Sequence, residues 1–293
     1  MTPEPPASDA PGVRPTPLFL LGAPRSGTTF LHQVIDSHPE VYVTDELRAV
    51  AWLVQEAERL REGFPAHGTP YPINHGRVFA EYLLNNAGRI LLPFYLRQAK
   101  RAGKPQIRYW GDKFPHYDEI LHLMPRLFPE ARYVLIHRDL RDTICSVVNG
   151  HHWPVERAAP YVCLIYDRYV RKADELVAEG TVPADRFLHV DYLGLNADAE
   201  GEAGRLFGSL GLGYPEATAA RVRELSGIQA HSIRRPGRTA ESFEIADSHR
   251  RWERDLSPAD LQAVLREIAW IAEAVAIGNR LQPGAPFTYP PPA

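Results

Sequence analysis

The sequence predicts an α/β fold with a single domain, in which a central parallel sheet of about five strands is flanked by helices. Short apolar runs of β type alternate with longer segments of helical period, which is typical of βαβ units. A glycine-rich turn follows the first apolar run and precedes a helical pattern. The 293 residues, of which 44 % are hydrophobic, are enough to bury one large core.

Five short apolar segments are the expected strands: Leu18–Leu21, Val41–Val43, Ile107–Trp110, Arg132–His137 and Arg186–Val190. Helical periodicity predicts helices from Thr28 to about Ser37, from about Asp45 onward, and near residues 77–101, 116–127, 139–149, 155–179 and 258–279. The segment of about 52–105, between the second and third strands, is expected to be a helical cap or insertion. We expect most of its rings to be core: Phe64, Tyr71, Phe79, Tyr82, Phe94 and Tyr95.

The ends of the chain differ in composition from the rest. Residues 1–16 are rich in proline and poor in large apolar side chains, so they are expected to be a disordered arm, and residues 284–293 to be a similar proline-rich tail. The folded domain is then expected over residues 17–283.

Charge and cysteine content exclude several classes of protein. The net charge of −3 argues against nonspecific nucleic-acid binding, and no apolar run approaches the length of a membrane span. Cys145 and Cys163 cannot form a disulfide framework and lack the spacing of metal ligands. We therefore expect a cytoplasmic protein that binds neither membrane nor metal, with buried thiols in a reducing compartment.

The glycine-rich turn, Gly22-Ala-Pro-Arg-Ser-Gly-Thr-Thr29, is the first candidate site. Between a strand and a helix, its backbone N–H groups would surround an anion at the helix N-terminus. The spacing is that of a nucleotide P-loop, so the domain is predicted to be P-loop-like, but Thr28 stands where a P-loop has lysine and Arg25 lies inside the loop. The site is therefore predicted to bind an anion other than a nucleoside triphosphate. A turn that only connects strand and helix is the alternative.

The residues Pro24-Arg-Ser-Gly-Thr-Thr29 resemble the 5′-phosphosulfate loop of sulfotransferases that use 3′-phosphoadenosine 5′-phosphosulfate (PAPS). The resemblance is to the bacterial type and covers roughly residues 18–256. It implies that the 5′ end of PAPS, a co-substrate, is held by Arg25, Ser26, Gly27, Thr28 and Thr29.

A second block, residues 132–146, resembles the 3′-phosphate motif of the same family. The resemblance implies that Arg138, at the end of a strand, and Ser146, on the next helix, bind the 3′-phosphate. Eight residues are about two helical turns, so the two side chains converge only if the chain turns sharply at the strand end. A solvated surface helix is the alternative.

Two weaker matches continue the resemblance. Residues 189–195 are similar to a Val-x-Tyr-Glu-Asp-Leu segment and imply that Tyr192 lies near the adenosine, although Leu193 and Gly194 replace the two acids. Residues 233–237 and 251–256 are similar to the C-terminal segment that closes over the 3′-phosphate. Arg234 and Arg235 are candidates there, and surface positions are the alternative.

The segment from Ser37 to Arg48 is similar to the pattern His-Pro-(x)5-Glu-Glu-x-Arg of tyrosylprotein sulfotransferases. The resemblance implies that Glu46 is the general base and that Arg48 orients it or the acceptor. Asp45 replaces the first acid and is expected to be a helix N-cap. The alternative for Glu46 is a solvated acid in the first turn of a helix.

The segment Gly111-Asp-Lys113-Phe-Pro-His116 is similar to the family's Asp-Lys-x-Pro motif. The resemblance implies that Lys113 contacts the transferred group or the bridging oxygen. His116 is the rival base, because cytosolic sulfotransferases place a histidine two residues after the lysine. Pro115 takes that place here, so Glu46 is the preferred base.

These residues together predict an enzyme that moves the sulfuryl group from PAPS to an acceptor hydroxyl, a small-molecule or peptide phenol or alcohol, by in-line displacement without a metal. Glu46 takes the acceptor proton while Arg25, Lys113 and the loop amides stabilise the developing charge. A tyrosine-containing peptide is a narrower possibility. A P-loop kinase or NTPase and a non-catalytic nucleotide-binding protein are the alternatives.

Overall fold

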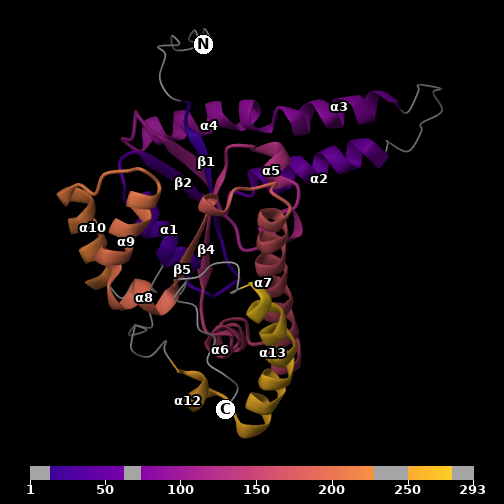
Figure 1. The fold of residues 1–293 in the computed structure, drawn as a ribbon, viewed down its shortest axis with the longest axis vertical. Helices are drawn as coiled ribbons and strands as arrows, with labels where there is room; N and C mark the ends of the chain where they lie inside the picture. Colours follow the sequence, from indigo (N-terminus) through magenta and orange to yellow (C-terminus); the bar gives the residue numbers. More distant parts are fainter. Residues whose placement is uncertain (1–13, 63–73, 228–249, 279–293) are drawn as a thin grey trace.

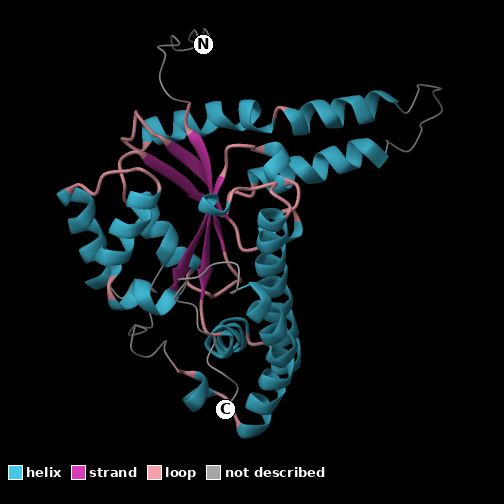
Figure 2. Cartoon of the chain, in the orientation of Figure 1, coloured by secondary structure: helices cyan, strands magenta, loops and turns pink. Residues whose placement is uncertain are grey.

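The structure is a computed structural model that describes residues 14–62, 74–227 and 250–278. Its centre is one sheet of five strands in the order β2-β3-β1-β4-β5, and every pair of neighbours is parallel (Figures 1 and 2). The predicted fold class is confirmed. The strands are β1 Thr16–Leu21, β2 Val41–Asp45, β3 Tyr109–Lys113, β4 Arg132–His137 and β5 Phe187–Asp191.

The third strand lies two or three residues further along the chain than the sequence predicts. Its last residues, Asp112 and Lys113, pair with β1 on one side and with β2 on the other. The strand was predicted to end at Trp110 because the apolar pattern ends there and polar residues, Asp112 and Lys113, follow. Pairing on both sides satisfies their backbone groups, so the strand continues to Lys113.

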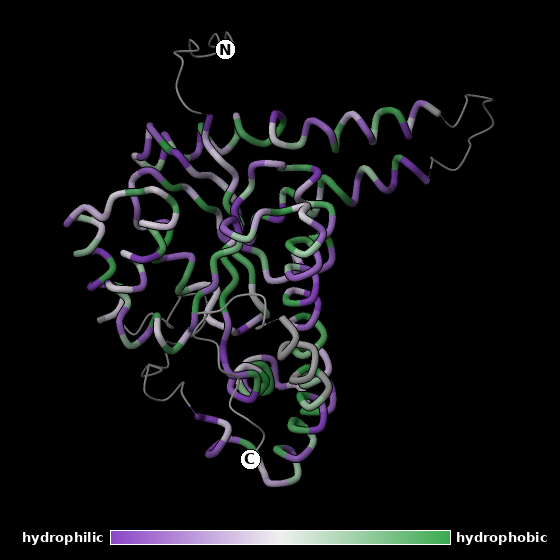
Figure 3. Tube along the Cα trace, viewed as in Figure 1, coloured by the Kyte–Doolittle hydropathy of each residue, from purple (hydrophilic) through white to green (hydrophobic). Residues whose placement is uncertain are grey.

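Alternate side chains of the strands belong to two separate cores, one on each face of the sheet. Helices cover each face (Figure 3). Leu18 and Leu20 of β1 belong to one core with α1 Thr28–Asp36, α8 Tyr192–Ala197, α9 Ala199–Ser209 and α10 Glu216–Gly227. Phe19 and Leu21 belong to the other core, with α6 Leu140–His151, α7 Val155–Ala178 and α13 Pro258–Gly278. Helices α8 to α10 were not predicted from the sequence.

Three helices fill the segment between β2 and β3: α2 Ala49–Glu62, α3 Asn74–Asn85 and α4 Ala87–Arg101. The single helix expected over 77–101 is therefore two helices separated at Asn86. Helices α2 and α3 run side by side and extend away from the rest of the molecule (Figure 1).

This extension leaves several aromatic rings uncovered. Tyr95 is fully buried, as expected, but Phe79, Tyr82 and Phe94 are 52 %, 59 % and 40 % exposed, so the prediction that they are core is wrong. A projecting pair of helices is covered on fewer sides than a helix packed against the sheet, which a helical period does not reveal. Phe64 and Tyr71 lie outside the described residues.

Two other predicted helices differ from the structure in where they begin or in how far they extend. The helix expected from Asp45 begins at Ala49, and Asp45 is the last residue of β2 rather than an N-cap. The helix expected over 116–127 is a 3₁₀ turn at Tyr117–Glu119 followed by the short α5, Met124–Leu127. The tail at 284–293 and the arm up to residue 13 lie outside the described residues, whereas Thr16 starts β1. No helix in the described ranges has the length and apolar character to cross a membrane.

Candidate active site

The carboxyl ends of all five strands meet at one edge of the sheet, and each brings a predicted site residue there. Ligands of open parallel sheets bind outside this edge. In spatial order these residues are Glu46 after β2, Lys113 at the end of β3, the glycine-rich loop after β1, Arg138 after β4 and Tyr192 after β5. The candidate base and lysine therefore lie on one side of the loop, and the candidate nucleotide residues on the other.

The loop between β1 and α1 has the backbone of an anion site. Arg25 and Gly27 have φ angles of 69° and 100°, and the N–H of Ser26 donates to the carbonyl of Ala23 at 3.1 Å. Gly27 is the N-cap of α1, and no side-chain hydrogen bond caps this helix among the described residues. The N–H groups of the first turn thus remain for an anion.

The side chain of Ser26 supports the same interpretation. Ser26 is 2 % exposed, and its Oγ has no hydrogen-bond partner among the described residues. A buried hydroxyl is normally hydrogen-bonded. An anion oxygen in the loop would accept from it.

Tyr192 forms the wall of the loop on the side of β5. A Cβ on Gly27 would lie 2.3 Å from Cδ2 of Tyr192, so the ring packs directly on the Gly27 backbone. The guanidinium of Arg138 lies 4.4 Å from the centre of the same ring. Both residues are buried, and burial lowers the pKa of Arg138.

Arg138 and Ser146 converge on Arg25 from β4 and α6. An Arg138 amino group donates to the carbonyl of Arg25 at 2.8 Å, and Nε of Arg25 donates to Oγ of Ser146 at 3.2 Å. The chain turns at Asp139, whose side chain accepts from the N–H of Arg141 and caps α6. This is the sharp turn at the strand end that the spacing requires.

The second half of the site is the pair formed by Glu46 and Lys113. Nζ of Lys113 lies 2.9 Å from Oε1 of Glu46 and 2.5 Å from Oδ1 of Asp45, and the Lys113 side chain is only 1 % exposed. The N–H of Glu46 donates to the carbonyl of Lys113 at 2.8 Å. The side chain of Arg48 reaches back to Glu46 at 3.8 Å.

The turn that carries Glu46 is held by Asp112, to which the sequence analysis gave no role. Asp112 is fully buried and accepts hydrogen bonds from the N–H groups of Leu47 and Arg48, both at 3.1 Å. Burial raises the pKa of Asp112, and its hydrogen bonds oppose that rise. The signal in the sequence was an acid directly before the candidate lysine.

His116, the rival base, points toward α7. Its Nε2 lies 3.1 Å from the hydroxyl of Tyr161, and its Nδ1 lies 4.0 Å from a carboxylate oxygen of Asp118. Tyr161 is on α7. In the described part of the chain, the polar contacts of His116 are with Tyr161 and Asp118, and neither Glu46 nor Lys113 is among them.

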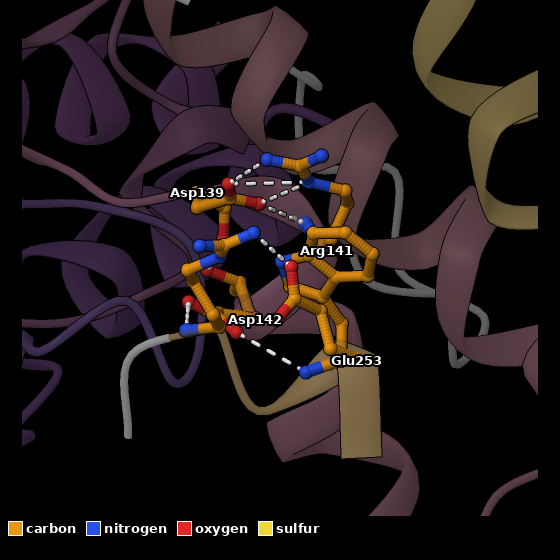
Figure 4. A network of polar contacts seen from close by, with 7 residues as sticks. Asp139, Arg141, Asp142 and Glu253 are labelled. Carbon is orange, nitrogen blue, oxygen red and sulfur yellow. Dashed lines mark hydrogen bonds and ion pairs between the residues drawn. The ribbon is translucent and has the colours of Figure 1, made fainter. Parts of the chain in front are cut away.

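The C-terminal segment at 251–256 packs on α6, close to the end of β4. Asp142 accepts from the N–H groups of Arg250 and Trp252, and the guanidinium of Arg141 lies 4.2 Å from the centre of the Trp252 ring. Arg141 also forms a bidentate ion pair with the carboxylate of Asp139 (Figure 4). Arg234 and Arg235 lie outside the described residues.

Within residues 14–62, 74–227 and 250–278, no group of three or more His, Cys, Asp and Glu side chains is placed to hold a metal ion.

Comparison with known proteins finds similar sequences and structures. The chain is 28 % identical over 131 residues to protein-tyrosine sulfotransferase 2 of Gallus gallus, a match that covers 45 % of this chain and 33 % of the relative. The match thus spans about a third of the length of that relative.

Two solved structures share the fold. The sulfotransferase domain of the Synechococcus olefin synthase superposes with a TM-score of 0.58 and 21 % identity, over 92 % of this chain and 98 % of that one. A mouse sulfotransferase complexed with PAP, 3′-phosphoadenosine 5′-phosphate, has a TM-score of 0.50 and 13 % identity, over 93 % of this chain and 90 % of that one. The sequence profile of the sulfotransferase family matches residues 17–216, which include the loop, Glu46, Lys113, Arg138 and Tyr192. The chain therefore belongs to the sulfotransferase family.

Proposed function

We propose that this protein transfers the sulfuryl group of PAPS to an acceptor hydroxyl by in-line displacement. The observation that carries the proposal is the placement of Glu46 and Lys113, 2.9 Å apart, beside a loop built to hold an anion. An acid and a lysine next to a phosphate site are the groups that a sulfuryl transfer needs for proton removal and charge stabilisation.

The residues on either side of the loop fit the donor. Ser26, with its buried hydroxyl, and the backbone of Gly27 to Thr29 would hold the 5′-phosphosulfate end. Arg138 and Ser146 would bind the 3′-phosphate, and Tyr192 would lie near the adenosine. The donor, when bound, supplies an activated sulfuryl group.

The chain's own residues would then act on the acceptor and on the developing charge. Glu46 would accept the proton of the acceptor hydroxyl at a carboxylate oxygen. Lys113 is buried at the carboxyl end of β3. Together with the loop amides, it would stabilise negative charge on the transferred group and on the departing phosphate. Arg25 supplies the cation of the loop, and its guanidinium is held at Ser146.

The acceptor is proposed as a phenol or alcohol, on a small molecule or a peptide. The likeness to a protein-tyrosine sulfotransferase and the Glu46–Arg48 pair favour a tyrosine-containing peptide as the first acceptor to test. Transfer of labelled sulfate to such a peptide, compared with a simple phenol and an aliphatic alcohol, separates these classes.

A cytoplasmic location is proposed from the thiols. Cys145 and Cys163 are both free and buried, as expected in a reducing compartment. Fractionation of the source cells would test the compartment directly.

The first experiment measures thermal stabilisation by PAP, ADP and Mg-ATP, with Arg138→Ala as the matched variant. Ligand at 100 times its dissociation constant adds about 2.7 kcal/mol to the free energy of unfolding. We expect stabilisation by PAP that exceeds that by ADP and that is lost in Arg138→Ala. Equal or greater stabilisation by Mg-ATP would contradict the proposal and favour a P-loop kinase. The sequence argues against that alternative, because Thr28 stands where a P-loop kinase has its lysine.

A further inference from the structure

Asp112 is a buried carboxylate to which the proposed mechanism gives no task. It is fully inaccessible, and no ion pair of Asp112 occurs within the described part of the chain. Four neutral donors hold it instead. Oδ1 accepts from Oγ1 of Thr44 at 2.7 Å and from the N–H of Leu47 at 3.1 Å, and Oδ2 accepts from the hydroxyl of Tyr117 at 2.8 Å and from the N–H of Arg48 at 3.1 Å.

Two of these donors belong to the turn that carries Glu46, and that turn has an unfavourable backbone. Glu46 and Arg48 have φ angles of 57° and 62°, in the left-handed region that residues with a side chain rarely adopt. Such a conformation persists only where the surroundings enforce it. The Asp112 carboxylate binds the two consecutive N–H groups that follow Glu46, with one oxygen for each.

Lys113, which follows Asp112 in β3, fixes the other end of the turn. The N–H of Glu46 donates to the carbonyl of Lys113, and the Lys113 ammonium donates to the Glu46 carboxylate. Asp112 and Lys113 therefore hold the two ends of the turn. Asp112 binds the N–H groups of the two residues after Glu46, and Lys113 binds the backbone N–H and the carboxylate of Glu46. With either contact removed, the turn could relax toward ordinary φ values and carry the carboxylate away from Lys113.

We propose that Asp112 is the positioning residue of this active site, which acts through Glu46 by clamping the left-handed turn that aims its carboxylate. The inference rests on the proposed function, in which Glu46 is the base. A negative carboxylate suits the task because both of its oxygens accept hydrogen bonds. An asparagine has one accepting oxygen and would turn an NH₂ group toward donors at the other position.

The test is a double-mutant cycle on sulfate transfer, with Asp112→Asn, Glu46→Gln and the double variant. A misplaced reacting group commonly costs about 100-fold in rate, so we expect kcat of Asp112→Asn to fall by about that factor. The dissociation constant of PAP, measured by calorimetry, should stay within about two-fold, because the four hydrogen bonds of Asp112 do not involve the loop, Arg138 or Tyr192. The double variant should be no slower than Glu46→Gln, because Asp112 would no longer have a Glu46 carboxylate to position.

Tyr117→Phe is the matched control. It removes one of the four hydrogen bonds to Asp112 without touching the two turn amides, so kcat should fall by no more than about three-fold. If Asp112→Asn does not fold, Asp112→Glu enters the same cycle. It retains the charge and both oxygens but moves them by one methylene group, and it should show the same lack of additivity with Glu46→Gln.

Three results would overturn the inference: wild-type kcat in Asp112→Asn, losses that multiply in the double variant, or a loss of PAP affinity that parallels the loss of kcat. The last two would mean that Asp112 serves the fold as a whole. Failure of the proposed function is a separate outcome, because the wild type itself would then transfer no sulfate. Failure of Glu46 as the base is also distinct, because Glu46→Gln would then retain wild-type kcat whatever Asp112 does.

Discussion

Gly27 and Tyr192 are in direct contact across the nucleotide side of the site, and a Cβ at position 27 would lie only 2.3 Å from the Tyr192 ring. The loop after β1 and the helix after β5 therefore fit together only because position 27 has no side chain. The same ring carries the Arg138 guanidinium at 4.4 Å. A change at Gly27 would thus reach the proposed 3′-phosphate residues through Tyr192.

Gly27→Ala is expected to lower the free energy of unfolding by about 1–3 kcal/mol, because a φ of 100° is unfavourable for alanine and the new methyl group displaces Tyr192. PAP binding should weaken with it, as measured by calorimetry. Gly180→Ala is the matched control: Gly180 has a φ of 69° but no atom within 4 Å of an added Cβ. It should lose stability without losing PAP affinity. Wild-type PAP affinity in Gly27→Ala would contradict the role of this contact.

Lys113→Met is expected to reduce kcat about 100- to 1,000-fold, which is the usual loss when one donor that stabilises transition-state charge is removed. Lys113→Arg should not restore the rate, because a larger, planar guanidinium would replace a compact ammonium on a side chain that is only 1 % exposed. Lys172→Met, which removes a lysine on α7, is the control and should keep kcat within two-fold. Steady-state kinetics with labelled sulfate gives both numbers, and a rate for Lys113→Met close to that of Lys172→Met would refute the assignment.

Ser146→Ala is expected to weaken PAP binding about three- to ten-fold and to leave ADP binding unchanged, since a neutral hydrogen bond contributes about 0.5–1.5 kcal/mol. Among the described residues, Ser146 Oγ is hydrogen-bonded to Arg25 alone, so stability should change little. Ser209→Ala, on α9, serves as the control because Ser209 Oγ donates only locally, to Arg205. Equal weakening of PAP and ADP would place Ser146 away from the 3′-phosphate.

Stability is expected to fall between about pH 6.5 and pH 4 because of a buried histidine. Burial lowers the pKa of His189 to about 4, and its ring stacks on His137 with centres 5.1 Å apart. In that window the unfolded chain binds a proton at His189 that the folded chain does not bind, so the free energy of unfolding rises with pH. The full effect of one such group is up to about 3 kcal/mol.

Urea denaturation at pH 7, 6 and 5 measures this slope. His189→Gln should have a shallower slope than the wild type, whereas His152→Gln, which changes an exposed histidine, should match the wild type. An unchanged slope in His189→Gln would assign the pH dependence to other groups.

The local structure around the glycine-rich loop and Arg138 could be predicted from short stretches of sequence. A strand, a glycine-rich turn and a helix start are encoded within a dozen residues, and Asp139 provides the N-cap that turns the chain between Arg138 and Ser146. The exposure of Phe79 and Tyr82 could not be predicted, because a helical period shows which side chains share a face but not whether another element covers it. Helices α8 to α10 were missed for a related reason. Residues of α8 and α9 become core where these helices pack against β5, and residues of α10 where it packs against α9 and α1.

The sequence by itself determined the parallel α/β class and the glycine-rich turn from Gly22 to Thr29 between a strand and a helix, because these depend on periodicity and turn chemistry over short stretches. Only the tertiary structure decided that β3 lies between β1 and β2. That strand order brings Lys113 to Asp45 and Glu46, and it places Asp112 against the amides of Leu47 and Arg48. The pairing of strands far apart in the chain is governed by the packing of the whole core, so no local pattern around Glu46 specifies the carboxylate that holds its turn.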